Sequence, residues 1–313
     1  MSRSDLSFNP PLPSPISPLP SRRAGLVAVA GKPNAGKSTL LNRLVGQKLA
    51  ITSPKPQSTR DRVTGIITRG DAQIVLLDTP GLIDPRYALQ HAMRASALKA
   101  LHEADAILYL VDAAQAAHPS LADAAGLNAP PRAPVVTVLS RIDLLGANHR
   151  VALTSLHPDA IPVSALTGEG IETLLSRVEA LLPESPFLYD PEDASAQHLR
   201  FFAAELVRET TLEQLDDEVP YAIACQIEEF REDRSPVYIR AVVYVERDSQ
   251  KRIVIGHQGS RIREIGRAAR LKIEALVGAP VYLDLWVKVL ANWRRDPNAL
   301  RRLGYQVPED HGP

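Results

Sequence analysis

A glycine-rich segment between a predicted strand and a predicted helix carries the strongest chemical signal in the chain. In GKPNAGKST, Gly31, Gly36, Lys37 and Ser38 have the spacing Gly-x4-Gly-Lys-Ser. The glycines allow backbone angles that turn successive N–H groups toward one concavity, and the N-terminus of the next helix adds partial positive charge there. Such a concavity holds phosphate oxygens. We therefore expect Lys37 to bridge the β- and γ-phosphates of a nucleotide and Ser38 to ligate Mg²⁺.

A second segment, VLLDTPG, places a carboxylate at the end of a hydrophobic strand. Asp78 ends this strand, where it can reach Mg²⁺ through a water molecule. Thr79, Pro80 and Gly81 begin the following loop, and the Gly81 N–H can sense a γ-phosphate. Asp-Thr-Pro-Gly alone is as typical of an ordinary turn, but its place after a phosphate loop makes it much more specific.

The polar stretch KPQSTRDR between these two segments offers another hydroxyl to the metal. We expect Thr59 to be the second Mg²⁺-ligating hydroxyl, on a loop that orders only when the γ-phosphate is present. Ser58 is an equally simple hydroxyl and stays open as the alternative. Without its neighbours, this stretch would indicate only a solvated linker.

The stretch VVTVLSRIDLL, residues 135–145, predicts a buried strand that delivers Asp143 to its carboxyl end. A carboxylate accepts hydrogen bonds from N1–H and the 2-amino group of guanine, and it disfavours adenine, which presents a lone pair at N1. In the later segment VSAL, the Ala165 amide can donate to the guanine O6. A guanine site therefore fits better than the rival interpretation, an ATPase that binds ATP more tightly than GTP.

Composition limits the class of protein and places any polyanion-binding surface. The chain of 313 residues can form two domains with separate cores, and its 45% hydrophobic and 23% charged residues are normal for a soluble globular protein. Residues 221–313 carry 16 Lys and Arg against 12 Asp and Glu, so a polyanion should bind in this last third. The single Cys225 excludes an internal disulfide and fits a reducing cytosol, and no apolar run is long enough to span a membrane.

Apolar strands and amphipathic helices alternate over the first part of the chain, which predicts a mostly parallel sheet with helices on both faces. After a proline-containing hinge, the order α-β-β-α-α-β describes a small α+β domain. We divide the chain into a disordered Pro- and Ser-rich tail (1–22), an α/β domain (23–186), a linker with the first helix of the second domain (187–220), an α+β domain (221–300) and a C-terminal tail (301–313).

The order of these motifs resembles that of the Era family, the bacterial GTPases of small-subunit assembly. The likeness is carried by GKPNAGKSTLLNRLVGQKLAITSPKPQSTRDR, by VIGHQGSRIREIG and by LWVKV, and it spans about residues 25–306. It implies a P-loop NTPase G domain followed by a type II KH domain, and GTP hydrolysis coupled to binding of the 3′ end of 16S rRNA during 30S subunit assembly. The residues that it implies for GTP binding are Gly31, Lys32, Pro33, Asn34, Ala35, Gly36, Lys37, Ser38, Thr39, Asp78, Thr79, Pro80, Gly81, Leu82, Ser140, Arg141, Asp143, Ser164, Ala165 and Leu166.

The chain departs from the family pattern in the base loop, where Ser140 and Arg141 stand in place of Asn and Lys. In the family, the Asn bridges the base to the phosphate loop, and Ser140 is too short to make both contacts. Arg141 can lay its aliphatic stem along the base as the Lys does. We expect guanine preference to persist through Asp143, with an affinity weakened by about 1 kcal/mol for one lost hydrogen bond.

The resemblance also implies how hydrolysis would proceed. The residues expected to act in it are Lys37, Asn34, Thr59 and Gly81. Leu82 stands where a Ras-like enzyme carries a water-orienting Gln, so we expect slow intrinsic turnover. In similar GTPases an Asn at the position of Asn34 helps hold a K⁺ ion that substitutes for an arginine finger, which suggests K⁺ as a second cofactor beside Mg²⁺.

Residues 251–272 contain a Gly-x-x-Gly loop between two predicted helices, together with seven Lys and Arg against one Glu. In a KH fold this loop clamps a few nucleotides of single-stranded RNA, and a basic surface attracts phosphate. We expect Arg261 and Arg263 to contact the RNA backbone, and Ile255 and Ile262 to line a base groove. The full set expected to bind RNA is Ile255, Gly256, His257, Gln258, Gly259, Arg261, Ile262 and Arg263.

Two questions stay open at the level of sequence. The C-terminal NWRRDPNALRRLGY adds four arginines, which either extend the RNA contact or approach anionic lipids of the inner membrane. We expect a cytoplasmic monomer, peripheral to the membrane in the second case. The alternative function is a non-hydrolysing, nucleotide-responsive RNA-binding scaffold, which Leu82 and the altered base loop favour and the intact phosphate and metal residues oppose.

Overall fold

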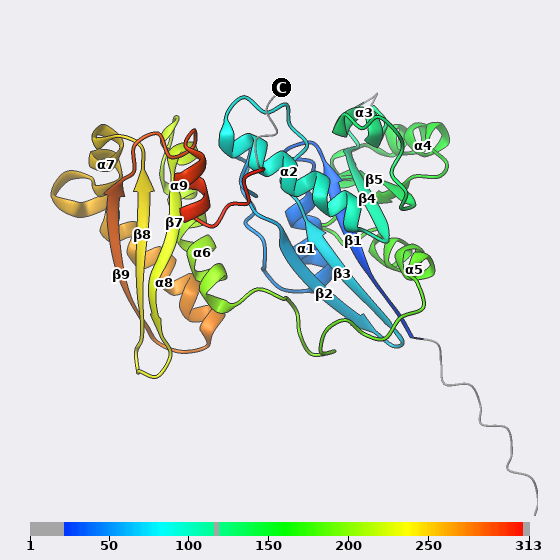
Figure 1. Ribbon diagram of the computed structural model, residues 1–313. Coiled ribbons are helices and arrows are strands. Elements are labelled where there is room, and N and C mark those ends of the chain that lie inside the picture. The colour runs from blue at the N-terminus through cyan, green and yellow to red at the C-terminus, as the bar shows by residue number, and fades with distance from the viewer. Residues whose placement is uncertain (1–21, 116–118, 309–313) are drawn as a thin grey trace, which may run out of the picture.

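The computed structural model describes residues 22–115 and 119–308, which form two domains side by side (Figure 1). Residues 1–21 of the expected N-terminal tail and residues 309–313 of the expected C-terminal tail lie outside the described residues. Among the residues that are described, no helix is both long enough and apolar enough to cross a membrane.

Six strands form the sheet of the first domain, in the order β2-β3-β1-β4-β5-β6. They are β1 (Arg23–Gly31), β2 (Val63–Arg69), β3 (Ala72–Asp78), β4 (Ala106–Asp112), β5 (Val135–Ser140) and β6 (Ile161–Val163). β2 pairs antiparallel with β3, and the other neighbours pair in parallel. The carboxyl ends of β1, β3, β4 and β5 therefore meet at one edge of the sheet, where a ligand site of an α/β protein is expected.

Helices cover both faces of this sheet, as the alternation in the sequence predicts. On one face lie α1 (Lys37–Val45) and α5 (Ile171–Leu181), and on the other lie α2 (Ala88–Glu103), α3 (Leu121–Ala125) and α4 (Ala147–Leu156). The sequence does not predict α3 or α4. The first has five residues and the second has no buried residue, so neither shows the apolar periodicity that indicates a helix.

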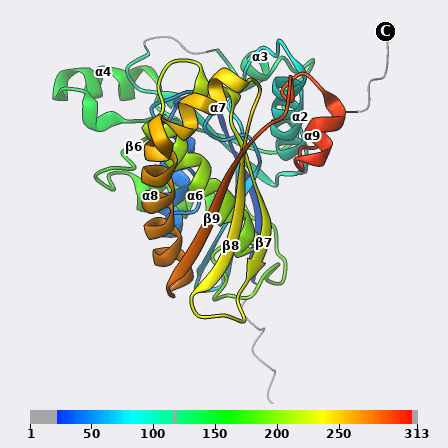
Figure 2. The same cartoon turned by 90° about the vertical axis from the view of Figure 1, so that its left-hand side faces the viewer.

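The second domain has a three-stranded sheet, β7-β8-β9, with helices packed against it (Figure 2). β7 and β8 pair antiparallel, β8 and β9 pair in parallel, and the core between sheet and helices is aliphatic. The expected order α-β-β-α-α-β is confirmed. Its elements are α6 (Leu199–Gln214), β7 (Ala224–Arg231), β8 (Val237–Val245), α7 (Asp248–Ile255), α8 (Ser260–Val277) and β9 (Val281–Val289).

The C-terminal segment packs between the domains instead of continuing as a separate tail from residue 301. Helix α9 (Pro297–Arg302) crosses that boundary and lies between the two domains in Figure 1. Trp293 is completely buried, donates a hydrogen bond from Nε1 to the Ala222 carbonyl at 2.9 Å, and stacks on Tyr305. Leu89 of α2 belongs to the same apolar cluster, so this segment contacts both domains.

Candidate functional site

The loop after β1 follows a backbone path that favours glycine. Gly31 has a φ of 151°, and a β-carbon there would lie 2.5 Å from the Leu110 carbonyl oxygen on β4. Gly36 has a φ of 90° and directly precedes Lys37, the first residue of α1. A side chain would be strained at either glycine. The loop thus leads into the N-terminus of α1, where backbone N–H groups without helical partners favour an anion.

Lys37 lies inside this loop. Its side-chain ammonium donates to the carbonyl oxygens of Gly31 at 3.2 Å and Lys32 at 2.9 Å. Burial lowers the pKa of Lys37 to about 8, although the Asp78 carboxylate raises it. The lysine therefore presents a cation in a site of low solvent access, where it interacts strongly with an incoming phosphate.

Two hydroxyls and a buried carboxylate converge at the start of α1. Ser38 Oγ lies 2.7 Å from Asp78 Oδ2 and 2.8 Å from Thr59 Oγ1, and the Thr59 hydroxyl is 3.4 Å from the same carboxylate oxygen. Asp78 is fully buried, and among the described residues its Oδ1 has no hydrogen-bond partner. Burial raises the pKa of Asp78 to about 6, against the opposing effects of Lys37 and the two hydroxyls. An orphaned carboxylate oxygen beside two hydroxyl oxygens is a donor set that fits Mg²⁺.

The same contacts distinguish Thr59 from Ser58, which the sequence leaves as alternatives. Both residues border one cavity, but the Thr59 hydroxyl is the one that contacts Ser38 and Asp78. The backbone carbonyl of Ser58 accepts a hydrogen bond from Arg208 at 2.5 Å. Thr59 is therefore the hydroxyl in place to ligate a metal.

The loop after Asp78 lies against the phosphate loop. A β-carbon on Gly81 would lie 2.7 Å from the Pro33 backbone nitrogen, so this approach requires a glycine. Thr79 donates its hydroxyl to the Val29 carbonyl at 2.9 Å, and Leu82 donates its N–H to the Gly31 carbonyl at 3.0 Å. The Leu82 side chain packs into the core of the sheet, away from the cavity. Its position agrees with the expectation that it orients no water.

The base loop begins where β5 ends. Ser140 Oγ contacts the carbonyl oxygens of Ala35 at 2.8 Å and Val111 at 3.1 Å. Arg141 has a left-handed backbone, with a φ of 62°, and its guanidinium forms an ion pair with Asp112 at 2.9 Å. The next turn carries Asp143, which is half-buried, and no hydrogen bond or ion pair with another described residue engages its carboxylate. That carboxylate is free to accept hydrogen bonds from a ligand.

A tight turn after β6 supplies the other side of the base pocket. Ser164 is completely buried, its N–H donates to the Glu169 carbonyl at 3.0 Å, and its hydroxyl accepts from the Thr167 N–H at 3.1 Å. No described residue accepts a hydrogen bond from the Ala165 N–H. Leu144 and Leu166 border the cavity with 60% and 78% of their surface exposed, which is apolar surface that a bound base would cover.

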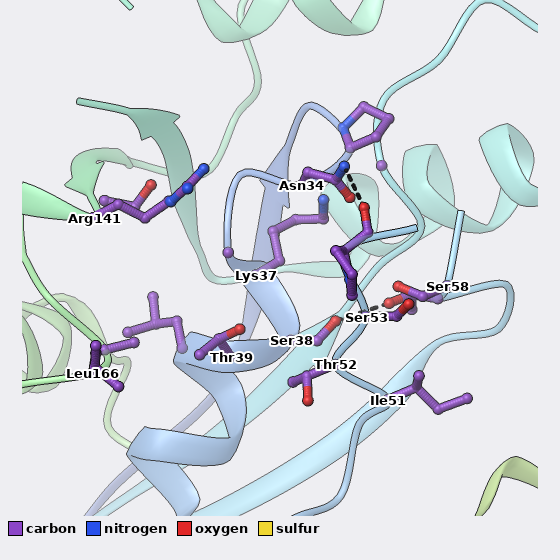
Figure 3. Close-up of a pocket in the computed structure, with 18 of the residues that line it drawn as sticks. Asn34, Lys37, Ser38, Thr39, Ile51, Thr52, Ser53, Ser58, Arg141 and Leu166 are labelled. Atoms are coloured by element: carbon purple, nitrogen blue, oxygen red, sulfur yellow. Dashed lines mark hydrogen bonds between the residues drawn. The ribbon is translucent and has the colours of Figure 1, made fainter. Parts of the chain in front are cut away.

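These segments surround one cavity of about 630 Å³ (Figure 3). Most of the residues that the sequence predicts for nucleotide binding line it. These are Pro33, Asn34, Gly36, Lys37, Ser38, Thr39, Thr59, Gly81, Ser140, Arg141, Asp143, Ala165 and Leu166. The others do not line it, and they are Gly31, Lys32, Ala35, Asp78, Thr79, Pro80, Leu82 and Ser164. The start of the loop between α1 and β2 also borders the cavity, although its sequence has no nucleotide-binding motif. Its lining residues are Ile51, Thr52, Ser53, Pro54 and Gln57.

This loop, residues 50–62, is held from outside the first domain. Arg208 on α6 donates to Ser58 O, and Lys55 donates to the carbonyl oxygens of Leu212, at 2.7 Å, and Leu215. Arg60 donates to the Tyr221 carbonyl at 3.1 Å. In each of these contacts a Lys or Arg side chain donates to the backbone carbonyl of an uncharged residue. The sequence therefore carries no signal for them, because every residue except proline has the same backbone carbonyl and N–H groups.

A buried glutamate on α6 adds a second connection. Glu209 is fully buried and accepts from Lys48 at 2.7 Å, from Lys272 of α8 at 3.2 Å and from the Thr52 N–H at 3.3 Å. Lys272, counted above among the basic residues of the expected RNA surface, also contacts Glu213 at 2.6 Å. The Lys272 ammonium is therefore paired with glutamates at the domain boundary and does not add to the exposed basic surface.

The Gly-x-x-Gly loop joins α7 to α8 as expected. Gly256 has a φ of 73°, and a β-carbon there would lie 2.7 Å from Arg261 Cβ. Arg261 is exposed, whereas the Arg263 guanidinium folds back onto the carbonyl oxygens of Gln258 and Gly259, each at 3.1 Å. His257 is exposed as well, and the half-buried isoleucines on either side, Ile255 and Ile262, pack against the domain core. The loop thus exposes backbone and cationic groups next to the two isoleucines that pack against the core.

Comparisons with known proteins agree with both halves of this arrangement. Residues 26–141 match the family model of the 50S ribosome-binding GTPases, and residues 218–294 match that of the KH domain. The GTPase Era of Nocardioides sp. is 43% identical and that of Halothermothrix orenii is 40% identical. These alignments cover 92% and 91% of this chain, and 98% and 99% of the respective relatives.

Solved structures give the same result in three dimensions. A variant of Aquifex aeolicus Era bound to GDP·AlF₄⁻ matches with a TM-score of 0.85 and 39% identity. The match covers 91% of this chain and 100% of that chain. An Era in complex with MgGDPNP and nucleotides 1506–1542 of 16S ribosomal RNA has the same TM-score, identity and coverage. The likeness therefore extends over both domains and not only over the first.

The buried guanidinium of Arg208 generates a stability prediction. It forms a two-point contact with Glu205 at 2.6 and 2.8 Å, and its charge also stabilises the nearby Asp61 carboxylate. Arg208→Ala removes one partner of a buried pair, which should lower the free energy of unfolding by about 3–5 kcal/mol. The melting temperature and the rate of proteolysis within residues 50–62 measure the effect.

An exposed ion pair provides the matched control. Arg150 and Glu169 are 34% and 51% exposed, so Arg150→Ala should cost about 1 kcal/mol or less. Equal melting temperatures for the two variants, or unchanged proteolysis in Arg208→Ala, would contradict the anchoring role of Arg208.

Proposed function

The chain belongs to the Era family of GTPases. On this premise we propose that it binds GTP and GDP with Mg²⁺ and hydrolyses GTP. We propose further that its nucleotide state is coupled to binding of the 3′ end of 16S rRNA during 30S subunit assembly. The observation that carries the proposal is the convergence of Lys37, the Ser38 hydroxyl and the Asp143 carboxylate on one cavity. The cavity combines a phosphate site, a metal site and a base site, and the same chain has a Gly-x-x-Gly loop. This combination supports the proposed function more strongly than any one of these features would.

The phosphate site would act through charge and position. Lys37 contacts the β- and γ-phosphates once its ammonium leaves the carbonyls of Gly31 and Lys32. The N–H groups of the loop and of α1 receive the other phosphate oxygens. The Gly81 N–H lies beside this loop and would donate to the γ-phosphate. These fixed donors stabilise the charge that spreads over the phosphoryl oxygens in the transition state.

Three residues would hold Mg²⁺. Ser38 and Thr59 supply hydroxyl oxygens, and Asp78 supplies a carboxylate through water. When bound, the ion would neutralise the negative charge that develops on the phosphate oxygens. Thr59 comes from residues 50–62, so the position of this loop relative to Ser38 decides whether both hydroxyls are in place.

The base site would select guanine at its Watson–Crick edge. No described residue engages the Asp143 carboxylate or the Ala165 N–H. The carboxylate would accept from N1–H and the 2-amino group, and the N–H would donate to O6. Adenine presents a lone pair where the carboxylate requires a donor. This geometry favours GTP over ATP as the substrate.

A monovalent cation would complete the catalytic site. Asn34 has a left-handed backbone, and its side-chain amide contacts the Pro54 carbonyl oxygen at 3.2 Å (Figure 3). Nδ2 donates this hydrogen bond, and both residues line the cavity. The Asn34 amide oxygen and the Pro54 carbonyl oxygen would be the protein ligands of K⁺. When bound, such an ion would supply the positive charge that an arginine finger provides in other GTPases.

The second domain would bind the RNA. The backbone of residues 256–259 clamps single-stranded nucleotides, Arg261 and Arg263 contact phosphate, and Ile255 and Ile262 form the floor of the base groove. His257 and Gln258 are exposed at the tip of the loop. We further propose that the protein is a cytoplasmic monomer and that the exposed Arg301 and Arg302 on α9 mediate peripheral contact with the anionic inner membrane.

The choice of base provides the first test of this function. Asp143→Asn exchanges an acceptor for a donor at the Watson–Crick edge, so the variant should lose its preference for GTP over XTP and bind XTP more tightly. Dissociation constants for GTP, ATP and XTP on both proteins measure the change. Unchanged GTP preference in the variant, or tighter ATP than GTP binding by the native protein, would contradict the base assignment.

Phosphate release from GTP tests hydrolysis against the scaffold alternative. The native protein should release phosphate, and Lys37→Ala should reduce the rate by about 100-fold or more. RNA with the sequence of the 16S 3′ end should change the native rate, whereas Gly259→Asp should abolish this response. Unaltered RNA-free turnover in Gly259→Asp serves as the folding control. A native rate no faster than that of Lys37→Ala would favour the non-hydrolysing scaffold.

The monovalent cation makes a separate prediction. Phosphate release should be several-fold faster in K⁺ than in Na⁺ at equal ionic strength, and Asn34→Ala should remove the difference because it removes one oxygen ligand. Equal native rates in both salts would refute the role of Asn34, and so would a K⁺ preference that persists in the variant.

A further inference from the structure

The hydroxyl of Ser140 is fully occupied by the protein. Ser140 is 6% exposed, and its Oγ lies 2.8 Å from the Ala35 carbonyl oxygen and 3.1 Å from the Val111 carbonyl oxygen. Both neighbours are acceptors. A serine hydroxyl has one proton, so Ser140 can donate to only one of them at a time. It has no proton left for a ligand and can offer a ligand only a lone pair.

This limit matters because of what guanine presents on its imidazole edge. N7 and O6 are acceptors, so a protein that contacts N7 must supply a donor. The neighbour of Ser140 that also borders the cavity, Arg141, has its guanidinium in an ion pair with Asp112 at 2.9 Å, and the two residues also border an adjacent smaller cavity. The side chains at the start of the base loop are therefore committed to the protein.

Ser140 has a different task, which is to hold the phosphate loop. Ala35 lies in that loop and is 4% exposed, and Val111 lies on the neighbouring strand β4. One hydroxyl therefore connects the end of β5 to both. The contact fixes the carbonyl of a residue between Asn34 and Gly36, both of which line the nucleotide cavity. Ser140 is thus a positioning residue for the phosphate loop.

We propose that this site recognises guanine at its Watson–Crick edge alone, through Asp143 and the Ala165 N–H, and leaves N7 without a side-chain donor. The inference rests on the proposed guanine site and specifies its chemistry. It extends the ligand range to guanine nucleotides in which N7 is replaced by carbon. An Asn at residue 140, as in the family pattern, has two N–H donors. It can keep the contact with the Ala35 carbonyl and turn a second proton toward the base.

Competition binding with GDP and 7-deaza-GDP, which has a C–H group at position 7, tests the proposal. The native protein should bind the two within about twofold of each other, because no protein hydrogen bond is lost. Ser140→Asn should bind GDP about 3- to 10-fold more tightly than 7-deaza-GDP, the ratio that one neutral hydrogen bond produces. Ser140→Ala should weaken both nucleotides equally, since it releases the phosphate loop without changing contacts to the base.

The outcomes separate this inference from the function on which it rests. A native preference for GDP over 7-deaza-GDP of about fivefold or more would overturn the role of Ser140 while leaving guanine binding intact, since such a ratio requires a donor at N7. A ratio that changes in Ser140→Ala would overturn it too. The native comparison and Ser140→Ala keep the proposal falsifiable if Ser140→Asn does not fold. Equal binding of GDP and ADP would instead refute the guanine site itself.

Discussion

The burial of the Asp78 carboxylate is the constraint around which the nucleotide site is arranged. The carboxylate lies at the end of β3 and is completely inaccessible to solvent. Removing an isolated charge from water costs about several kcal/mol of desolvation free energy. Lys37, Ser38 and Thr59 surround it, and one carboxylate oxygen has no hydrogen-bond partner among the described residues. Thr59 comes from a loop without regular secondary structure, so the rest of the molecule must hold that loop in place.

Helix α6 does so, although it belongs to the other domain. Its apolar residues, such as Val207, are part of the core of the second domain, whereas Arg208 and Glu209 are buried against the loop of the first. Glu209 also contacts Lys272 on α8, the helix that begins at the Gly-x-x-Gly loop. The loop that carries the metal hydroxyl and the helix that begins at the RNA loop therefore contact the same buried glutamate. A shift of α6 would therefore change the surroundings of the loop that carries Thr59 and of helix α8.

The sequence predicts the parts of this arrangement that are local. The spacing from Gly31 to Ser38 predicts a strand, a loop and a helix N-terminus because the backbone freedom of the glycines and the start of a helix are local properties of the chain. Thr59 and Ser58 could not be separated without the position of Asp78, and the side chain of Leu82 could not be placed in the core without the sheet. The pairing of Lys272 with Glu209 depends on tertiary packing alone. Charge counting therefore overestimated the basic surface.

The proposed guanine preference does not depend on the Asn that this chain lacks in the base loop. Holding the phosphate loop and recognising the base are separate tasks, and the hydroxyl of Ser140 is sufficient for the first. N7 is an acceptor in adenine as well as in guanine, so a donor there strengthens binding of both purines without distinguishing them. The distinction lies at the opposite edge, where Asp143 requires donors that only guanine provides. With the proposed base site, Ser140 in place of Asn should lower the affinity for either purine nucleotide and leave the preference between them to Asp143.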